Sequence, residues 1–190
     1  MATQYVKGLQ SNNVGACVKH FAVNNQENRR RTVNVVVDER TLREIYLKAF
    51  EMIVKEANPW SVMSAYNKLN GKYCTENEVL LNILKKEWNF DGIVITDWGA
   101  ENDRVKGLLA GNELEMPGGR GNGKEEIIQA VKEGKVSEEY LNEIVDRILN
   151  IAFQSILKIF MELLILYYLL KIQKVTISLL IFGDWIQIMK

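Results

Sequence analysis

A carboxylate and an indole directly follow an apolar run near the middle of the chain. Residues 92–96 are rich in β-branched side chains, and Asp97 and Trp98 come immediately after them. Such a run is typical of a strand buried on both faces in a parallel sheet. Ligands in α/β folds bind at the carboxyl ends of these strands. An acid beside a flat aromatic ring at that position points to carbohydrate chemistry, although an Asp after a strand also commonly caps a helix or forms a turn.

A second polar pair ends an earlier predicted strand. Lys19 and His20 lie at the end of residues 15–21, where both could donate hydrogen bonds to substrate hydroxyls. A regular strand would point them to opposite faces, so a bulge or loop entry is needed to aim both at one ligand. The alternatives are a surface lysine beside a structural histidine, or a Schiff-base aldolase in which Lys19 supplies the amine.

Two further groups of polar residues follow strand ends. Glu27 and Arg30 belong to an amide-rich loop after the first strand, which can bind a polyol or merely hold its own backbone. Tyr66 closes the predicted strand 61–66, where its hydroxyl could contact an acid or a ring oxygen. The Asn-Gly pair at residues 70–71 predicts a tight turn just beyond it.

Strands and helices alternate in the order expected of βαβ units, which predicts a parallel sheet. The expected strands are residues 15–21, 61–66, 92–96 and 113–116. The expected helices are 38–57, 76–88, 102–110, 124–133 and 137–153, the last with Ser137 as its N-cap. A complete (β/α)8, or TIM-type, barrel needs eight strands and typically ~250 residues. The chain therefore predicts a partial barrel, about half of one.

Two of the expected helices are amphipathic. Residues 38–57 place Leu42, Ile45, Phe50, Ile53 and Val54 near one face. The apolar side chains of residues 76–88 are Val79, Leu80, Ile83 and Leu84.

Composition narrows the classes of partner. The chain has 190 residues with 24 basic and 24 acidic side chains, so nothing in its charge favours nucleic acid. Cys17 and Cys74 are expected to be reduced packing residues, because neither has a metal-ligand spacing. With His20 as the single histidine, we expect no metal site and no cofactor. The amino terminus lacks the apolar core of a signal peptide, which favours a cytoplasmic location.

The carboxyl-terminal part differs in composition. Residues 1–154 read as one partial domain, whereas 155–190 are dominated by Ile and Leu without a clear period. Residues 156–170 are too short and too charged for a membrane span, so no membrane is expected. The tail resembles a frameshift product, with a membrane or packing tail as the alternative.

Residues 118–124 match part of a phosphate-binding loop, but Glu125 replaces its Ser/Thr, which favours a flexible loop.

The polar strand ends resemble one known family in order and spacing. The blocks that carry the resemblance to glycoside hydrolase family 3 are residues 19–30, 32–46, 62–71, 94–100 and 110–118. The resemblance covers about residues 1–154. Members acting on N-acetylhexosamines have Lys-His-Phe-Pro-Gly-His-Gly in the first block, whereas this chain has Ala22-Val23-Asn24 after Phe21. It therefore resembles the β-glucosidase and β-xylosidase side of the family.

The resemblance implies a retaining hydrolase of β-glucosides or related oligosaccharides. In such an enzyme one carboxylate forms a glycosyl-enzyme and a second acts as acid and base. It implies that Asp97 is the nucleophile and that Tyr66 lies against it. It implies substrate-binding roles for Lys19, His20, Trp98, Glu27 and Arg30.

The family's glycone-binding Asp and Arg come from earlier barrel strands, and its acid/base Glu comes from a following α/β-sandwich domain. None of these matches a residue of this chain. We therefore expect a fragment with little or no activity alone, whose partners would be the missing barrel half and sandwich domain. A non-catalytic half-barrel that binds sugars or assembles with a partner is the alternative.

Overall fold

The computed structural model describes residues 1–118, 123–154 and 163–164. The chain divides into two compact units, Met1–Ile151 and Ala152–Lys190. The expected apolar tail and the possible span at 156–170 lie outside the described residues, apart from 163–164, which are helical. Within the part of the chain that the structure describes, no helix is both long and apolar enough to cross a membrane.

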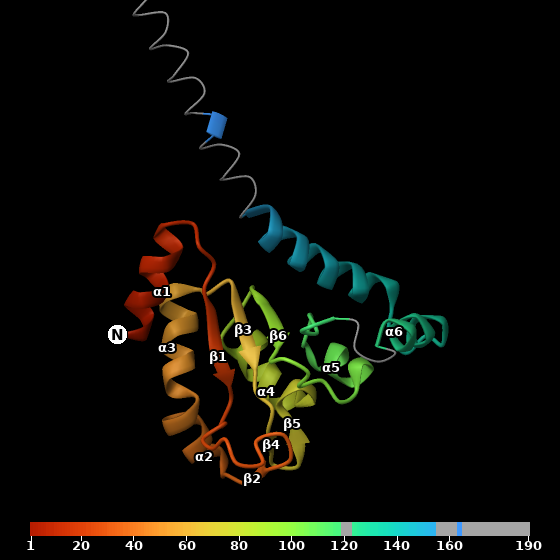
Figure 1. Ribbon diagram of the computed structural model, residues 1–190, viewed down its shortest axis with the longest axis horizontal. Coiled ribbons are helices and arrows are strands. Elements are labelled where there is room, and N and C mark those ends of the chain that lie inside the picture. Colours follow the sequence, from red (N-terminus) through yellow and green to blue (C-terminus); the bar gives the residue numbers. More distant parts are fainter. Residues whose placement is uncertain (119–122, 155–162, 165–190) are drawn as a thin grey trace, which may run out of the picture. The chain divides into compact units, whose positions relative to one another are not determined.

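A parallel sheet forms the centre of the first unit (Figure 1). Its strands lie in the order β1 (Cys17–Phe21), β3 (Ser61–Ser64) and β6 (Ile93–Thr96). The register pairs Phe21 with Ser64 and Ser64 with Thr96, so the three strands end at one edge. The predicted parallel arrangement is confirmed for three of the expected strands.

The fourth expected strand, residues 113–116, is reduced to an isolated parallel bridge between Leu114 and Ile95. The backbone N–H groups of Glu113 and Leu114 both donate to the carbonyl of Val94, at 2.9 and 3.1 Å. Because two successive residues share one acceptor, the regular ladder does not extend. The segment still follows β6 to its end, where Thr96 donates from its backbone N–H to the Leu114 carbonyl at 3.0 Å.

The helix expected at 38–57 is divided by a wide turn. It consists of α2 (Glu39–Thr41), the π-helical η1 (Leu42–Tyr46) and α3 (Lys48–Ala57). The Leu47 N–H donates to the Leu42 carbonyl at 2.8 Å, five residues back. The extra residue in this turn changes the helical phase, so Leu47 is fully buried. The expectation that Ile45 faces the core was wrong, because its side chain is 68% exposed.

A second π-helical turn ends the next helical region. This region comprises η2 (Cys74–Glu76), α4 (Glu78–Asn82) and η3 (Ile83–Glu87). Leu80, Ile83 and Leu84 are buried as predicted. Of the four apolar residues named for this helix, Val79 is exposed, because it lies in the first turn after the Asn77 cap and faces away from the core.

Two short elements complete the amino-terminal part, and neither was predicted. Helix α1 (Ala2–Ser11) packs against α3 on one side of the sheet (Figure 1). A small sheet of β2 (Asn34–Val35), β4 (Lys68–Leu69) and β5 (Lys72–Tyr73) lies near the ends of β1 and β3 (Figure 1). The Asn-Gly turn between β4 and β5 is confirmed, since Asn70 and Gly71 both have positive φ, at 49° and 92°.

The remaining helices of the first unit form their own apolar cluster. They are α5 (Arg104–Ala110), α6 (Gly123–Lys132) and a helix that begins at residue 138. The Ser137 hydroxyl caps the last of these by accepting the Tyr140 N–H at 3.1 Å, as predicted. The cluster is centred on Leu108, Ala130, Val136 and Ile144.

Of the two cysteines, one packs in the core as expected and the other does not. Both are free thiols. Cys74 is buried, and burial raises the pKa of its thiol to about 12. Cys17 is exposed at the start of β1, because β1 is an outer strand of the sheet. The expectation that Cys17 is a packing residue was therefore wrong.

Candidate active site

The carboxylate of Asp97 receives groups from all three strand ends of the central sheet. Its Oδ1 accepts the Trp98 backbone N–H at 2.7 Å and lies 3.1 Å from the Tyr66 hydroxyl. Its Oδ2 lies 3.2 Å from Nε2 of His20. Asp97 is 9% exposed, and its own N–H donates to the Ser64 carbonyl at 3.2 Å. The side chain is therefore held in one position at the carboxyl edge of the sheet.

His20 reaches Asp97 because β1 is irregular at its end. The pairing of β1 with β3 shifts between Val18 and Phe21, so the regular alternation of side chains is interrupted there. The peptide bonds before His20 and Ala22 are cis.

Burial lowers the pKa of His20, and the charges of Lys19 and Arg30 act in the same direction, whereas Asp97 opposes them. A neutral imidazole with its proton on Nε2 can donate to Asp97. Lys19 is exposed, and among the described residues it is His20, not Lys19, that contacts the Asp97 carboxylate.

Tyr66 is a buried hydroxyl donor with two acceptors. Its oxygen lies 3.1 Å from Asp97 Oδ1 and 2.9 Å from the Trp98 carbonyl oxygen. Burial raises the pKa of Tyr66, and the negative charge of Asp97 adds to this effect, whereas Arg31 and Arg30 oppose it. The phenol therefore stays protonated at neutral pH and can donate a single hydrogen bond.

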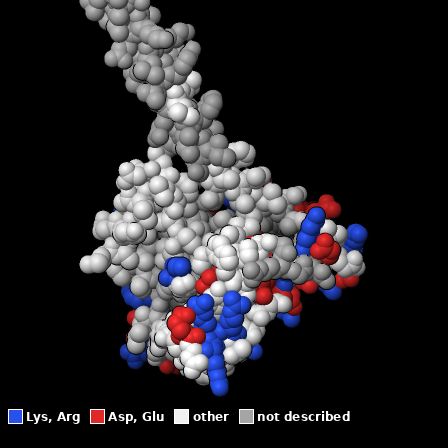
Figure 2. All heavy atoms as spheres, in the orientation of Figure 1, with Lys and Arg blue, Asp and Glu red and all other residues white. Residues whose placement is uncertain are grey.

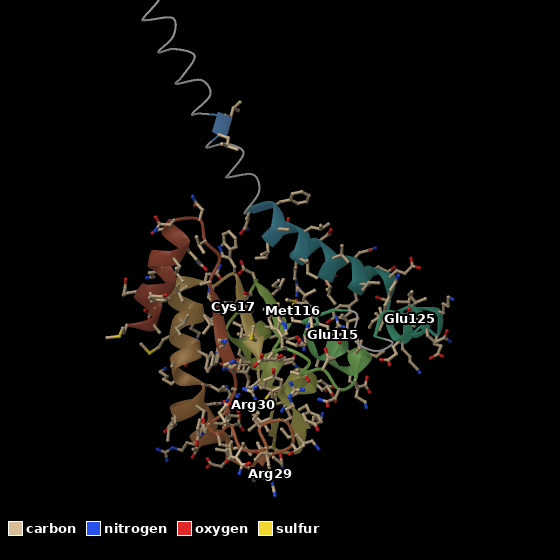
Figure 3. The ribbon with its side chains drawn as sticks, viewed as in Figure 1. Cys17, Arg29, Arg30, Glu115, Met116 and Glu125 are labelled. Atoms are coloured by element: carbon tan, nitrogen blue, oxygen red, sulfur yellow. The ribbon has the colours of Figure 1, made fainter. Side chains whose placement is uncertain are left out.

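Two guanidinium groups contact the Tyr66 ring from the loop that follows β1. The central carbon of Arg30 lies 4.6 Å from the ring centroid, and that of Arg31 lies 4.7 Å from it. Arg30 is also paired with the exposed Glu27 at 2.8 Å, and this ion pair links Glu27 to the site. In Figure 3, Arg30 lies near the strand ends, whereas Arg29 projects from the lower edge. Positive and negative side chains are mixed along this edge (Figure 2).

Arg31 was not among the residues expected at the site. Its Nη2 donates to the Trp98 carbonyl at 3.3 Å, across 67 residues of sequence. Within the run Arg29-Arg30-Arg31 the family resemblance indicated Arg30 alone, and the folded loop shows that Arg31 reaches Tyr66 as well.

The indole of Trp98 is half-exposed, at 48%, beside the buried Asp97. Its backbone is fully engaged, since the N–H donates to Asp97 and the carbonyl faces Tyr66 and Arg31. An anchored backbone with an open ring can offer a flat apolar surface to a ligand.

A buried charge cluster supports the strand that directly precedes Asp97. The Glu113 carboxylate accepts the Val94 N–H at 2.6 Å and the Arg147 guanidinium at 2.9 Å, and it also pairs with Lys85. Burial lowers the pKa of Lys85, although Glu113 opposes the shift. Because Val94 belongs to β6, this cluster stabilises the strand three residues before Asp97. Nothing in the segment Asn112-Glu113-Leu114-Glu115 indicates which of its two acids is buried beside Lys85 and Arg147.

A second buried acid lies in the loop after the site. One carboxylate oxygen of Glu101 is 3.4 Å from Arg104, whereas Oε1 is buried and has no hydrogen-bond partner in the described part of the chain. Burial raises the pKa of Glu101 to about 8, and Glu115, Glu76 and Asp103 add to this effect while Arg104 opposes it. Among the described residues, no group of three or more His, Cys, Asp and Glu is arranged to hold a metal ion.

Comparison with known proteins gives one consistent result. Residues 1–151 match the model of the glycosyl hydrolase family 3 N terminal domain. The thermostable beta-glucosidase B of Acetivibrio thermocellus is 59% identical over 157 residues, covering 82% of this chain and 21% of that protein. The exo-alpha-(1->6)-L-arabinopyranosidase of Bifidobacterium longum is 44% identical over 148 residues, covering 77% of this chain and 19% of that protein.

Solved structures agree with the sequence comparison. Beta-glucosidase 3B of Thermotoga neapolitana, in complex with glucose, superposes with a TM-score of 0.77 and 54% identity, over 80% of this chain and 22% of that one. The GH3 beta-glucosidase of Bifidobacterium adolescentis gives a TM-score of 0.78 and 42% identity, over 81% and 23% of the two chains. The chain thus spans about a fifth of the length of the relatives it matches.

Proposed function

Because the chain belongs to glycosyl hydrolase family 3, we propose that it carries the nucleophile of a retaining β-glucosidase and that this nucleophile is Asp97. The observation that supports the proposal is the set of groups around one carboxylate. Tyr66, the Trp98 N–H and His20 surround Asp97 at 2.7–3.2 Å. These contacts hold both carboxylate oxygens in a fixed orientation, which an attack on a bound sugar requires.

In the proposed reaction a carboxylate oxygen of Asp97 attacks the anomeric carbon as the bond to the leaving oxygen breaks. Oδ1 accepts two hydrogen bonds, whereas Oδ2 contacts His20 alone among the described residues, so Oδ2 is the more nucleophilic oxygen. The leaving oxygen takes its proton from a second carboxyl group, which in retaining enzymes lies ~5–5.5 Å from the first. We place that group outside this chain. Water then releases the sugar from Asp97.

We further propose that residues 1–154 form the carboxyl-terminal half of a (β/α)8 barrel. The parallel order β1-β3-β6, with Leu114 bridged to β6, supports this arrangement. In the proposal, the substrate is a β-glucoside or a related oligosaccharide. Lys19, His20, Arg30 and Glu27 then contribute to glycone binding, and Trp98 stacks on the sugar or aglycone. The chain alone hydrolyses such substrates slowly or not at all.

A covalent-labelling experiment tests the nucleophile without the missing acid. The substrate is 2,4-dinitrophenyl 2-deoxy-2-fluoro-β-glucoside, whose leaving group needs no protonation and whose fluorine slows release of the sugar. We expect mass spectrometry to find the fluoroglucosyl group on the peptide that contains Asp97. Asp97→Asn should abolish labelling, whereas Glu115→Gln, which removes a different carboxylate, should not. Labelling that survives Asp97→Asn would contradict the proposal.

A chimera tests the same proposal in a complete enzyme. Residues 1–151 replace the corresponding segment of the Acetivibrio thermocellus protein, which is 59% identical to this chain. We expect the chimera to hydrolyse an aryl β-glucoside and Asp97→Ala to reduce its kcat by several orders of magnitude. A folded chimera whose activity is insensitive to Asp97→Ala would refute the assignment.

A further inference from the structure

The single hydroxyl proton of Tyr66 has two acceptors within reach, and only one can receive it fully. Asp97 Oδ1 lies 3.1 Å from the phenolic oxygen, and the Trp98 carbonyl oxygen lies 2.9 Å from it. The distances slightly favour the carbonyl, whereas the charge favours the carboxylate, because a hydrogen bond to an ion is roughly twice as strong as a neutral one. The choice therefore depends on what else satisfies the carbonyl.

Arg31 is the residue that satisfies it. Its Nη2 donates to the Trp98 carbonyl at 3.3 Å, and its guanidinium lies over the Tyr66 ring with its central carbon 4.7 Å from the centroid. Arg30 lies equally close to the ring but is paired with Glu27. The two neighbouring arginines thus have different partners, and only Arg31 contacts an acceptor that competes for the Tyr66 proton.

We propose that Arg31 is a positioning residue that directs the Tyr66 proton to Asp97 by donating its own hydrogen bond to the Trp98 carbonyl. Among the described residues, the charged groups that act on the phenol are Asp97, directly after β6, and the guanidinium groups of Arg30 and Arg31 on the loop after β1. With the proton on the side of Asp97, the carboxylate keeps a charge-assisted hydrogen bond that fixes its orientation. The importance of that orientation for catalysis rests on the proposed function, but the position of the proton does not.

A double-mutant cycle read at Tyr66 tests this inference without substrate. The full chain is labelled with 3-fluorotyrosine, and fluorine NMR follows the titration of each phenol. Tyr66→Phe assigns the Tyr66 signal among the seven tyrosines. Asp97→Asn is made in the starting chain and in Arg31→Met, which keeps an apolar stem but no charge or donor. Arg31→Ala repeats the measurement should Arg31→Met lose the near-ultraviolet circular dichroism of the starting chain.

We expect Asp97→Asn to lower the pKa of Tyr66 both in the starting chain and in Arg31→Met. The decrease should be about twofold smaller in Arg31→Met, because the charge-assisted hydrogen bond from Tyr66 to Asp97 is already lost in that variant. Two fixed charges acting independently on Tyr66 would give equal shifts, and that result would overturn the proposal. Arg31→Lys, which keeps a charged donor, should restore part of the coupling. No restoration would assign the effect to packing and overturn the proposal as well.

The matched control is Arg29→Asn, which removes one positive charge from the same loop. Arg29 has a positive φ of 55°, a conformation that Asn tolerates. This variant should leave the coupling unchanged, and an equal reduction would show a general charge effect and refute the role of Arg31. If the coupling is found but Asp97 takes up no fluoroglucose, the proposed function fails and the positioning role stands.

Discussion

Nε2 of His20 lies 3.2 Å from Oδ2 of Asp97, so an imidazole at the end of one outer strand contacts a carboxylate at the end of the other. Burial nevertheless lowers the pKa of His20 below its ordinary 6.5, because removal from water outweighs the attraction of Asp97. The folded chain therefore binds a proton at His20 less readily than the unfolded chain does.

This relationship predicts a pH dependence of stability. Between the ordinary pKa of 6.5 and the lower folded value, the unfolded state binds more protons, so the free energy of unfolding falls as the pH drops through that window. In His20→Asn this contribution should be absent. Urea denaturation at pH 7 and at pH 5 measures how much the free energy of unfolding falls between these two values. We expect the fall to be smaller in His20→Asn than in the starting chain, by a fraction of the ~1.4 kcal/mol that one pKa unit represents. Equal slopes would contradict the prediction.

The half-exposed Trp98 predicts the size of an aromatic contribution to sugar binding. Trp98→Ala should weaken binding of methyl β-glucoside by roughly threefold to tenfold, because an aromatic stacking contact contributes ~0.5–1.5 kcal/mol. Saturation-transfer NMR with the full chain would measure the change. Trp98→Phe keeps a flat ring and should retain most of the affinity. Equal affinity in Trp98→Ala and the starting chain would remove Trp98 from the binding surface.

We expect removal of the Glu101 carboxylate charge to raise the free energy of unfolding. Its pKa is raised to about 8 by burial, so the folded chain holds the proton more tightly than the unfolded chain. The free energy of unfolding therefore falls as the pH rises from the ordinary value of 4.5 towards 8. Glu101→Gln should be more stable than the starting chain at pH 8, by ~1–3 kcal/mol, with a smaller difference at pH 5.

Thermal unfolding at the two pH values would check this prediction. Glu133→Gln, which changes an exposed acid, is the matched control and should show no such pH-dependent gain. A gain of the same size at pH 5 and pH 8 would point to packing rather than to ionisation of Glu101.

The buried cluster around Glu113 predicts a large loss of stability. Glu113→Ala leaves Lys85 and Arg147 without their shared anion and the Val94 N–H without its acceptor. We expect a loss of ~3–5 kcal/mol in the free energy of unfolding, as is usual when one partner of a buried ion pair is removed. Arg147→Ala should cost less, because Lys85 still neutralises Glu113. A loss below that of Arg147→Ala would contradict the role assigned to Glu113.

The sequence determined the features that depend on local residue order. The apolar runs predicted all three strands of the central sheet, and alternation with helices predicted their parallel direction. The Asn-Gly turn and the Ser137 cap were also readable, because each depends on a few adjacent residues. The polar strand ends indicated which side chains share one edge, since parallel strands end together. The order of the same blocks indicated the family.

Only the tertiary structure decided features that depend on residues far apart. The π-helical turn that exposes Ile45 and buries Leu47 adds one residue to a helical turn and leaves no signature in the apolar period. Arg31 reaches Trp98 across 67 residues, so its neighbours in sequence say nothing of that hydrogen bond. Likewise, Glu113 has its buried partners Lys85 and Arg147 only in the folded chain, since these three residues lie far apart in sequence. Local order thus specifies the strands and their ends, whereas burial and charge partners arise only when distant segments pack together.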